Sequence, residues 1–187
     1  MLLASGRNLD VIAQAQRLPG PRVEADPDRT AHAGLIAELA DRVTEDRHPL
    51  EGVYELTAVA LRDLAVEPDP RRATAWYLMA ALELLGYGPQ LQACATCDRQ
   101  LPAAPAAFSA AAGGLLCDTC ADPAWSRLSV AAIKVLRVMQ AGDGRLYGRL
   151  KLEGDLLNEV EETLEAHLEH HLDRRLNSLR FLRQLRT

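Results

Sequence analysis

The chain contains four cysteines, and their spacing limits what it can fold into more than any other feature. They form two Cys-x2-Cys pairs, Cys94 with Cys97 and Cys117 with Cys120. Each pair places two thiolates on one tight turn, and two such turns can complete the tetrahedral shell of four sulfurs that Zn²⁺ favours. We therefore expect one structural zinc ion in a ribbon at residues 93–122. Because protein sulfur would fill every ligand position, the metal is expected to hold structure and not to catalyse.

The residues between the two cysteine pairs have the composition of a hairpin. Phe108 and Ser109 are typical of a strand. Gly113 and Gly114 provide the backbone freedom that a return turn needs before Leu115.

Two other uses of the cysteines are open. Two disulfides would require an oxidising compartment, and the N-terminus has neither the basic start nor the apolar core of a signal peptide. A redox-active Cys-x2-Cys is the second alternative, although two paired motifs at ribbon spacing suit a metal better.

Composition favours packed helices. The chain has 187 residues but only two Phe, two Trp and four Tyr, so Leu, Ala and Val must build its core. A net charge of -5 argues against nucleic-acid binding over the whole surface, but not against a local basic patch. No uninterrupted apolar run is long enough to span a membrane, so we expect a soluble, cytoplasmic protein without membrane contact.

The N-terminal region has the period of a strand. Apolar residues at 9, 11, 13 and 15 alternate with mostly polar ones, which predicts a half-buried strand after a turn at residues 5–8. Pro19-Gly20-Pro21 then breaks the pattern, and residues 19–27 are expected to form a linker.

From residue 28 the period becomes helical, and caps and prolines predict where helices end. Asp26 and Pro27 suit the start of a helix that ends before Pro49. Further helices are expected from Val53 to Pro68, from Arg71 to Leu85 with Gly86 as the C-terminal cap, from Ser129 to Gly142, and from Asp155 onwards. The helix at 71–85 is apolar nearly all round and should be central. The expected fold is mostly α, a helical bundle with an inserted four-cysteine zinc ribbon.

The last predicted helix carries side chains that could perform chemistry. His167 and His171 are one turn apart and could chelate a metal, but no third ligand stands at a recognisable distance, which favours solvated histidines. Five carboxylates are most simply interpreted as the solvated face of the same helix. They are Glu159, Glu161, Glu162, Glu165 and Glu169.

The C-terminal tail is basic. Candidate contacts to a partner or to phosphate are Arg174, Arg175, Arg180 and Arg183. If the helix continues, Arg175 and Arg183 lie beside a leucine stripe, where they can bury their stems and present guanidinium groups. The alternative is that these arginines form internal salt bridges to neighbouring helices.

Several of these pieces together resemble one family. The run Ala80–Cys94 (AALELLGYGPQLQAC), the cysteine pairs with their intervening hairpin, and the tail His170–Leu182 (HHLDRRLNSLRFL) are similar to the DNA recombination and repair mediator RecO. The resemblance implies an N-terminal OB-fold barrel that binds single-stranded DNA, followed by a helical domain with a zinc ribbon. It also implies a mediator of the RecF pathway that is not an enzyme. Such a protein binds RecR and the acidic tail of the single-stranded-DNA-binding protein, helps to load RecA, and anneals complementary strands.

The resemblance covers about residues 6–183 and divides the chain unevenly. Residues 1–18 resemble only the last strand of the OB barrel, and residues 28–187 resemble the helical domain. An OB fold needs all its strands to close, so we expect weakened binding of single-stranded DNA and a chain that is truncated or starts too late. The alternatives are a zinc-stabilised interaction module that has lost DNA binding or, less favoured, a thiol-dependent enzyme.

Overall fold

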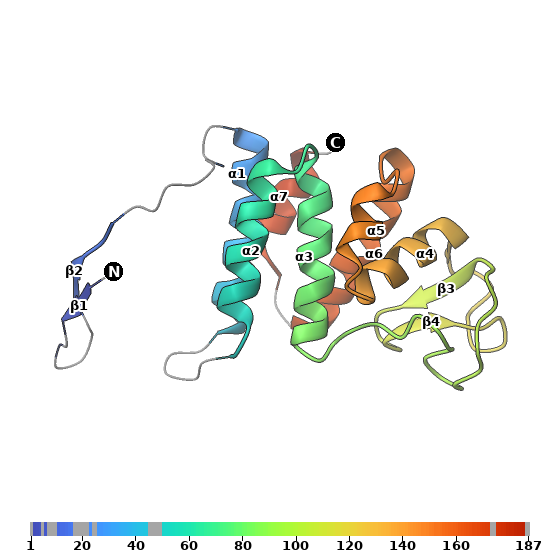
Figure 1. Cartoon of the computed structure of the whole chain (residues 1–187). Coiled ribbons are helices and arrows are strands. Elements are labelled where there is room, and N and C mark those ends of the chain that lie inside the picture. Colours follow the sequence, from blue (N-terminus) through green and yellow to red (C-terminus); the bar gives the residue numbers. More distant parts are fainter. Residues whose placement is uncertain are drawn as a thin grey trace.

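The computed structural model describes residues 2–4, 6, 11–16, 23, 26–44, 50–172 and 175–185. Helices stand side by side to form a bundle, and a small three-stranded ribbon is attached at one end of it (Figure 1). The expectation of a mostly helical fold with an inserted four-cysteine ribbon is confirmed. Among the described helices, none is long and apolar enough to cross a membrane.

The N-terminal strand differs from expectation. Strand β2 (Val11–Gln14) pairs antiparallel with β1 (Leu2–Ala4), a strand that the sequence pattern did not predict. The prediction that it is half-buried was wrong, because Val11 and Ile12 are each 60% exposed. A two-stranded hairpin has no second layer to cover either face, so alternation in the sequence does not produce burial here. The expected turn and most of the expected linker lie outside the described residues.

Two antiparallel helices begin the bundle. In α1 (Pro27–Val43), the Asp26 side chain accepts hydrogen bonds from the backbone N–H groups of Asp28 and Arg29, as the capping pattern predicted. Helix α2 (Val53–Val66) ends just before Pro68, also as predicted. Leu35, Ile36 and Leu39 are fully buried on the inner face of α1.

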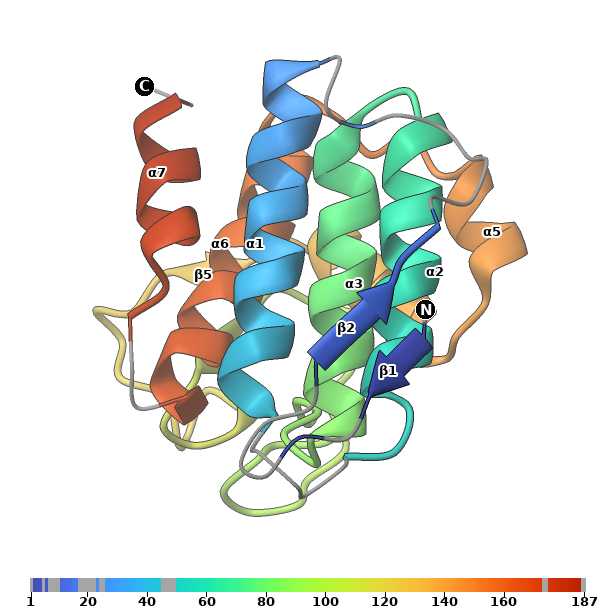
Figure 2. The same ribbon diagram turned by 90° about the vertical axis from the view of Figure 1, so that its left-hand side faces the viewer.

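Helix α3 (Pro70–Leu84) is central, as its all-round apolar character predicted. It contacts α1, α2, α4 and α6, and Asp69 caps its N-terminus. Gly86 follows its C-terminus with φ of 78°, a left-handed conformation that glycine adopts without strain. Figure 2 shows α3 between α1 and α2, with α7 on the far side of α1.

The ribbon is inserted between α3 and α4. Its strands β3 (Ala106–Ser109), β4 (Gly114–Leu116) and β5 (Arg127–Leu128) form an antiparallel sheet in the order β4-β3-β5. The predicted hairpin around Gly113-Gly114 is confirmed. Gly114 and Gln90 form an isolated parallel β-bridge. The backbone of Gln90 lies so close that a Cβ atom at residue 114 would clash with it. The segment that links α3 to the ribbon, residues 85–92, is called the arm. This close approach fixes the arm against the ribbon.

The last helices complete the bundle. They are α4 (Val130–Gln140), α5 (Gly144–Arg149), α6 (Gly154–Leu172) and α7 (Asn177–Leu185). The expectation of one continuous C-terminal helix was wrong, because α6 ends at Leu172 and a separate α7 begins at Asn177. Helix α7 packs beside α1 instead of extending α6 into solvent. The described side chains of α7 therefore do not continue the faces of α6, as the prediction of one continuous helix had required.

Candidate metal centre and its surroundings

The four cysteine sulfurs converge on one point of the ribbon. All four Sγ atoms lie within 4.8 Å of one another, and Sγ of Cys97 is 3.7 Å from Sγ of Cys117. A tetrahedral ion with metal–sulfur bonds of about 2.3 Å requires sulfur–sulfur distances of about 3.8 Å. The thiols are free and are too far apart for disulfides, whose S–S length is about 2.05 Å. The donor set therefore fits a thiophilic divalent cation with tetrahedral geometry.

Backbone hydrogen bonds hold each cysteine pair in a tight turn. The N–H of Cys94 donates to the carbonyl of Arg99, and the N–H of Asp98 donates back to the carbonyl of Cys94. At the second turn, the N–H groups of Cys120 and Ala121 both donate to the carbonyl of Cys117. Cys94 and Cys117 are buried in a small apolar cluster with Ala107, Leu116 and Ala121, whereas Cys97 is exposed.

The same turns favour ionisation of the Cys94 sulfur and oppose ionisation of the Cys120 sulfur. Burial opposes ionisation of Cys94, but hydrogen bonds from the backbone N–H groups of Cys117 and Thr96 help to outweigh it and lower its pKa to about 6. Hydrogen bonds to the sulfurs of Cys117 and Cys97 raise the pKa of Cys120 to about 12. The thiolate is the form that binds metal, so the ribbon is partly prepared for a cation before one arrives.

The arginine tail does not form the predicted arginine–leucine stripe. Leu176 and Leu179 are buried against the bundle, while Arg175 and Arg180 are exposed. Arg183 donates from Nε to Glu165 at 2.9 Å and also pairs with Glu169. For Arg183, the structure matches the alternative of an internal salt bridge. Arg174 lies outside the described residues.

The interpretation of the α6 carboxylates as a solvated face was wrong for most of them. Glu161 and Glu165 are each only 2% exposed, and Glu161 pairs with Arg71 on α3. Glu159 accepts hydrogen bonds from the backbone N–H and hydroxyl of Ser129 at the start of α4. Of the five, only Glu162 is exposed. Sequence reasoning missed these partners because they come from distant helices.

The interpretation of the histidines as solvated was also wrong for His167. This side chain is 1% exposed and makes an edge contact with Phe108 of the ribbon. Burial lowers its pKa below the ordinary value of 6.5, although a hydrogen bond to the Tyr87 carbonyl acts in the opposite direction. His171 is partly buried and stacks on the Tyr87 ring.

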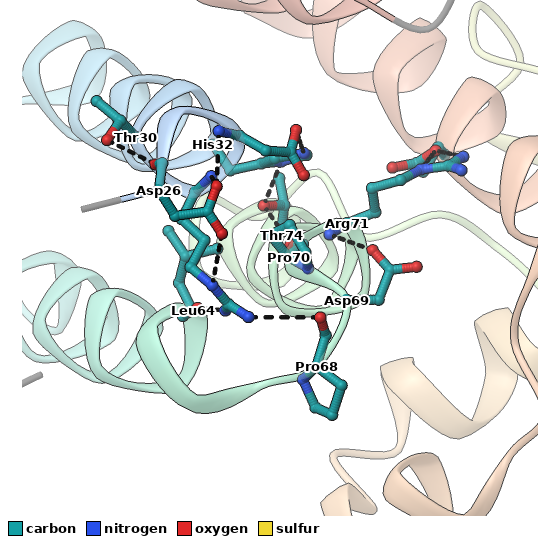
Figure 3. Close-up of polar contacts among 12 residues, drawn as sticks. Asp26, Thr30, His32, Leu64, Pro68, Asp69, Pro70, Arg71 and Thr74 are labelled. Atoms are coloured by element: carbon teal, nitrogen blue, oxygen red, sulfur yellow. Dashed lines mark hydrogen bonds and ion pairs between the residues drawn. The ribbon is translucent and has the colours of Figure 1, made fainter. Parts of the chain in front are cut away.

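Polar contacts at the N-terminal end of α3 hold three helices together (Figure 3). The sequence did not indicate these contacts. Arg29 donates to the carbonyls of Leu64 and Glu67 at the end of α2. His32 of α1 is buried and its Nδ1 lies 2.9 Å from the Thr74 hydroxyl, which itself donates to the Pro70 carbonyl. These arginine and histidine side chains are structural, because each satisfies carbonyl or hydroxyl oxygens at a helix end.

A cavity of about 350 Å³ opens between α2, α3 and α5. It is lined mainly by apolar side chains, including Leu56, Val59, Trp76 and Tyr147, and also by Asp63 and Glu67. No sequence pattern pointed to it, because its walls come from three segments that only the tertiary fold brings together.

The structure thus defines a mostly helical bundle with an inserted ribbon that brings four thiols together. The chain matches the family described as "Recombination protein O C terminal" over residues 24–180. It is 34% identical over 189 residues to the DNA repair protein RecO of Roseiflexus sp. (strain RS-1), covering 100% of this chain and 67% of that protein. It is 35% identical over 187 residues to the DNA repair protein RecO of Desulforudis audaxviator, and the match covers 98% of this chain and 74% of that protein. The chain therefore belongs to the RecO family of DNA repair proteins.

Proposed function

We propose that this chain acts as a RecO-type mediator of homologous recombination in the RecF pathway. In this role it would bind RecR and the acidic tail of the single-stranded-DNA-binding protein, help to load RecA, and anneal complementary strands. The observation that carries the proposal is the family match over residues 24–180, which contain both the helical bundle and the ribbon. A mediator of this kind acts by binding and not by covalent chemistry, and it would work in the cytoplasm with the chromosome.

The proposal includes one structural zinc ion bound by Cys94, Cys97, Cys117 and Cys120. The sulfur–sulfur distances fit a tetrahedral Zn²⁺ site, and every donor is a thiol. The ion would link the two turns that the apolar cluster of the ribbon only partly holds. Because four protein ligands fill the shell, its role would be to stabilise the ribbon.

For the acidic tail of the single-stranded-DNA-binding protein, we propose the outer face of α7. Arg180 is exposed there beside Phe181, and Leu185 follows one turn later. Phe181 is 50% exposed and Leu185 is 55% exposed. A guanidinium group beside exposed apolar side chains suits a peptide with carboxylates next to an apolar terminal residue. Arg174 and Arg175 precede this face and would add positive charge, whereas Arg183 is engaged with Glu165 and Glu169.

A second candidate is an interaction module that has little affinity for DNA. It is favoured by the way many arginines are used inside the fold. Arg29, Arg72 and Arg137 donate to backbone carbonyls, while Arg71 and Arg183 pair with carboxylates. Guanidinium groups that are engaged in this way are not available to phosphates. In the described part of the chain, these five guanidinium groups are therefore not available to a DNA-binding surface.

Binding and annealing measured on the same zinc-loaded protein distinguish the two candidates. A mediator should accelerate pairing of complementary oligonucleotides and should bind labelled single-stranded DNA with an affinity that falls as salt rises. A module without DNA function should bind RecR or the acidic tail peptide and leave the pairing rate unchanged. Failure to bind DNA, RecR and the peptide would overturn both. We also expect a version extended upstream by a complete OB barrel to bind DNA more tightly, because each stacked base contributes about 1–3 kcal/mol.

A further inference from the structure

A cluster of histidines occupies the C-terminal end of α6, where the helix meets both the ribbon and the arm that leads to it. His167 contacts Phe108 of the ribbon, and the rings of His167 and His171 are 4.5 Å apart. His171 stacks on Tyr87 of the arm at 4.7 Å, with the two rings nearly parallel. These contacts fix the orientations of both imidazoles.

One nitrogen of His167 has a defined role. Its Nε2 lies 2.8 Å from the Tyr87 carbonyl oxygen, which can only accept, so Nε2 carries the proton and donates it. In the neutral ring, Nδ1 then carries a lone pair. A backbone carbonyl that holds the far N–H of an imidazole is the arrangement that commonly orients a metal-binding histidine.

The other nitrogens are buried without a partner. Nδ1 of His167 and Nε2 of His171 are both inaccessible to solvent, and neither makes a hydrogen bond within the described part of the chain. A buried polar atom without a partner is costly and is rare in folded proteins, and a bound ion or water is a usual explanation. Here two such atoms belong to adjacent imidazoles.

The spacing and charge state of the two rings also suit a metal. Residues four apart lie on one face of a helix, which allows both rings to reach the same ion. Burial lowers the pKa of both His167 and His171, so the neutral form that binds metal is the stable one at pH 7. Neutral imidazoles bind divalent first-row metals well.

We propose that Nδ1 of His167 and Nε2 of His171 form a second metal site, separate from the cysteine ribbon, for a divalent first-row transition metal such as Ni²⁺, Cu²⁺ or Zn²⁺. The two imidazole nitrogens would supply part of the coordination shell of such an ion. An ion held there would join the end of α6 to the Tyr87 arm through the hydrogen bond of His167. The site would therefore brace the junction at which the ribbon meets the bundle.

The test is a Ni²⁺ titration of tag-free, zinc-loaded protein, in which calorimetry measures the binding. The zinc content of the protein is measured before and after the titration. Ni²⁺ avoids the thiol oxidation that Cu²⁺ would cause, and retained zinc shows that the cysteines are not the site. We expect one Ni²⁺ bound per chain. His167→Gln and His171→Gln should each weaken binding by about tenfold or more, because each removes one of two protein ligands. His170→Gln is the matched control, since His170 is exposed on the same turn of α6, and it should bind as wild type does.

His167 is buried, so its replacement could unfold the protein; His171 is only partly buried and keeps the test valid. Nitrogen NMR of the imidazoles adds an independent measurement. A second equivalent of Zn²⁺ should shift Nδ1 of His167 and leave its Nε2 protonated. The proposal is overturned if zinc-loaded protein binds no second metal, or if His170→Gln weakens binding as much as His171→Gln. Either result would assign the two nitrogens to a buried water.

Discussion

Glu38 on α1 caps α7 through Ser178, which is 140 residues further along the chain. One carboxylate oxygen accepts the backbone N–H of Ser178 at 2.8 Å and its hydroxyl at 2.5 Å, while the other accepts the N–H of Asn177. A helix N-terminus leaves backbone N–H groups without partners, and here another helix supplies the acceptor. This contact explains why α7 starts at Asn177 and lies against α1.

Glu38→Gln should destabilise the fold at pH 7 by about 1–2 kcal/mol, the range for loss of a charged cap. Burial opposes ionisation of Glu38, but hydrogen bonds from Ser178 and Asn177 outweigh it and lower the pKa below 4.5. Its contribution is therefore complete above pH 4.5 and declines as the pH falls through the lower value of the folded state. Urea unfolding at pH 7 and at pH 4 measures the difference. Wild type should lose more stability than Glu38→Gln over this interval, and exposed Glu162→Gln should behave as wild type does.

Cys117→Ser should abolish stoichiometric zinc and leave most of the helical circular dichroism signal. The ligands converge only in the folded ribbon, so metal binding and ribbon folding are linked, whereas the bundle has its own apolar core. Metal analysis after gel filtration measures the zinc, and Ser109→Ala is a control within the ribbon that leaves the sulfurs in place. A full complement of zinc in Cys117→Ser would refute the four-cysteine site.

Arg71→Met should cost about 3 kcal/mol, because it removes the cation of α3 that pairs with the buried carboxylate of Glu161. Adding Glu161→Leu to this variant should recover part of the loss, since the buried charge is then removed as well. The free energy of unfolding by denaturant gives both values. A double variant less stable than Arg71→Met alone would contradict this account.

Gly114→Ala should detach the arm from the ribbon. A Cβ atom at this position meets the backbone of Gln90, which cannot move aside as a flexible side chain would, and the φ of 155° also disfavours other residues. We expect faster amide exchange at Leu115, whose N–H donates to Gln90. Gly148→Ala is the control, because nothing lies within 4 Å of a Cβ atom there. Equal exchange in both variants would mean that the contact is dispensable.

Arg180→Ala and Phe181→Ser should each weaken binding of the acidic tail peptide, if α7 is its site. Loss of one charge-assisted hydrogen bond corresponds to about 1.5–3 kcal/mol. Fluorescence anisotropy of the labelled peptide measures the affinity, and Arg62→Ala on the exposed side of α2 serves as the control. If only the arginine variant responds and the effect disappears in salt, the face binds phosphate instead.

The local chemistry of the sequence determined the helix ends and the ribbon. Asp26-Pro27 predicts a helix start through contacts within three residues, and the structure confirms it. The cysteine spacing and Gly113-Gly114 placed the hairpin for the same reason, because each part of that pattern acts over a few residues. Those features could be predicted because neighbours along the chain decide them.

Only the tertiary structure decided which polar side chains became buried. Glu161 and His167 lie on a helix face that looks solvated in sequence, yet Arg71 and the Tyr87 carbonyl reach them from segments 80 or more residues away. The break between α6 and α7 has the same origin, since the capping carboxylate of Glu38 comes from α1. A charged or polar group is stable inside a protein only when a partner satisfies it, and the chain folds back to supply that partner at distances that no local pattern encodes.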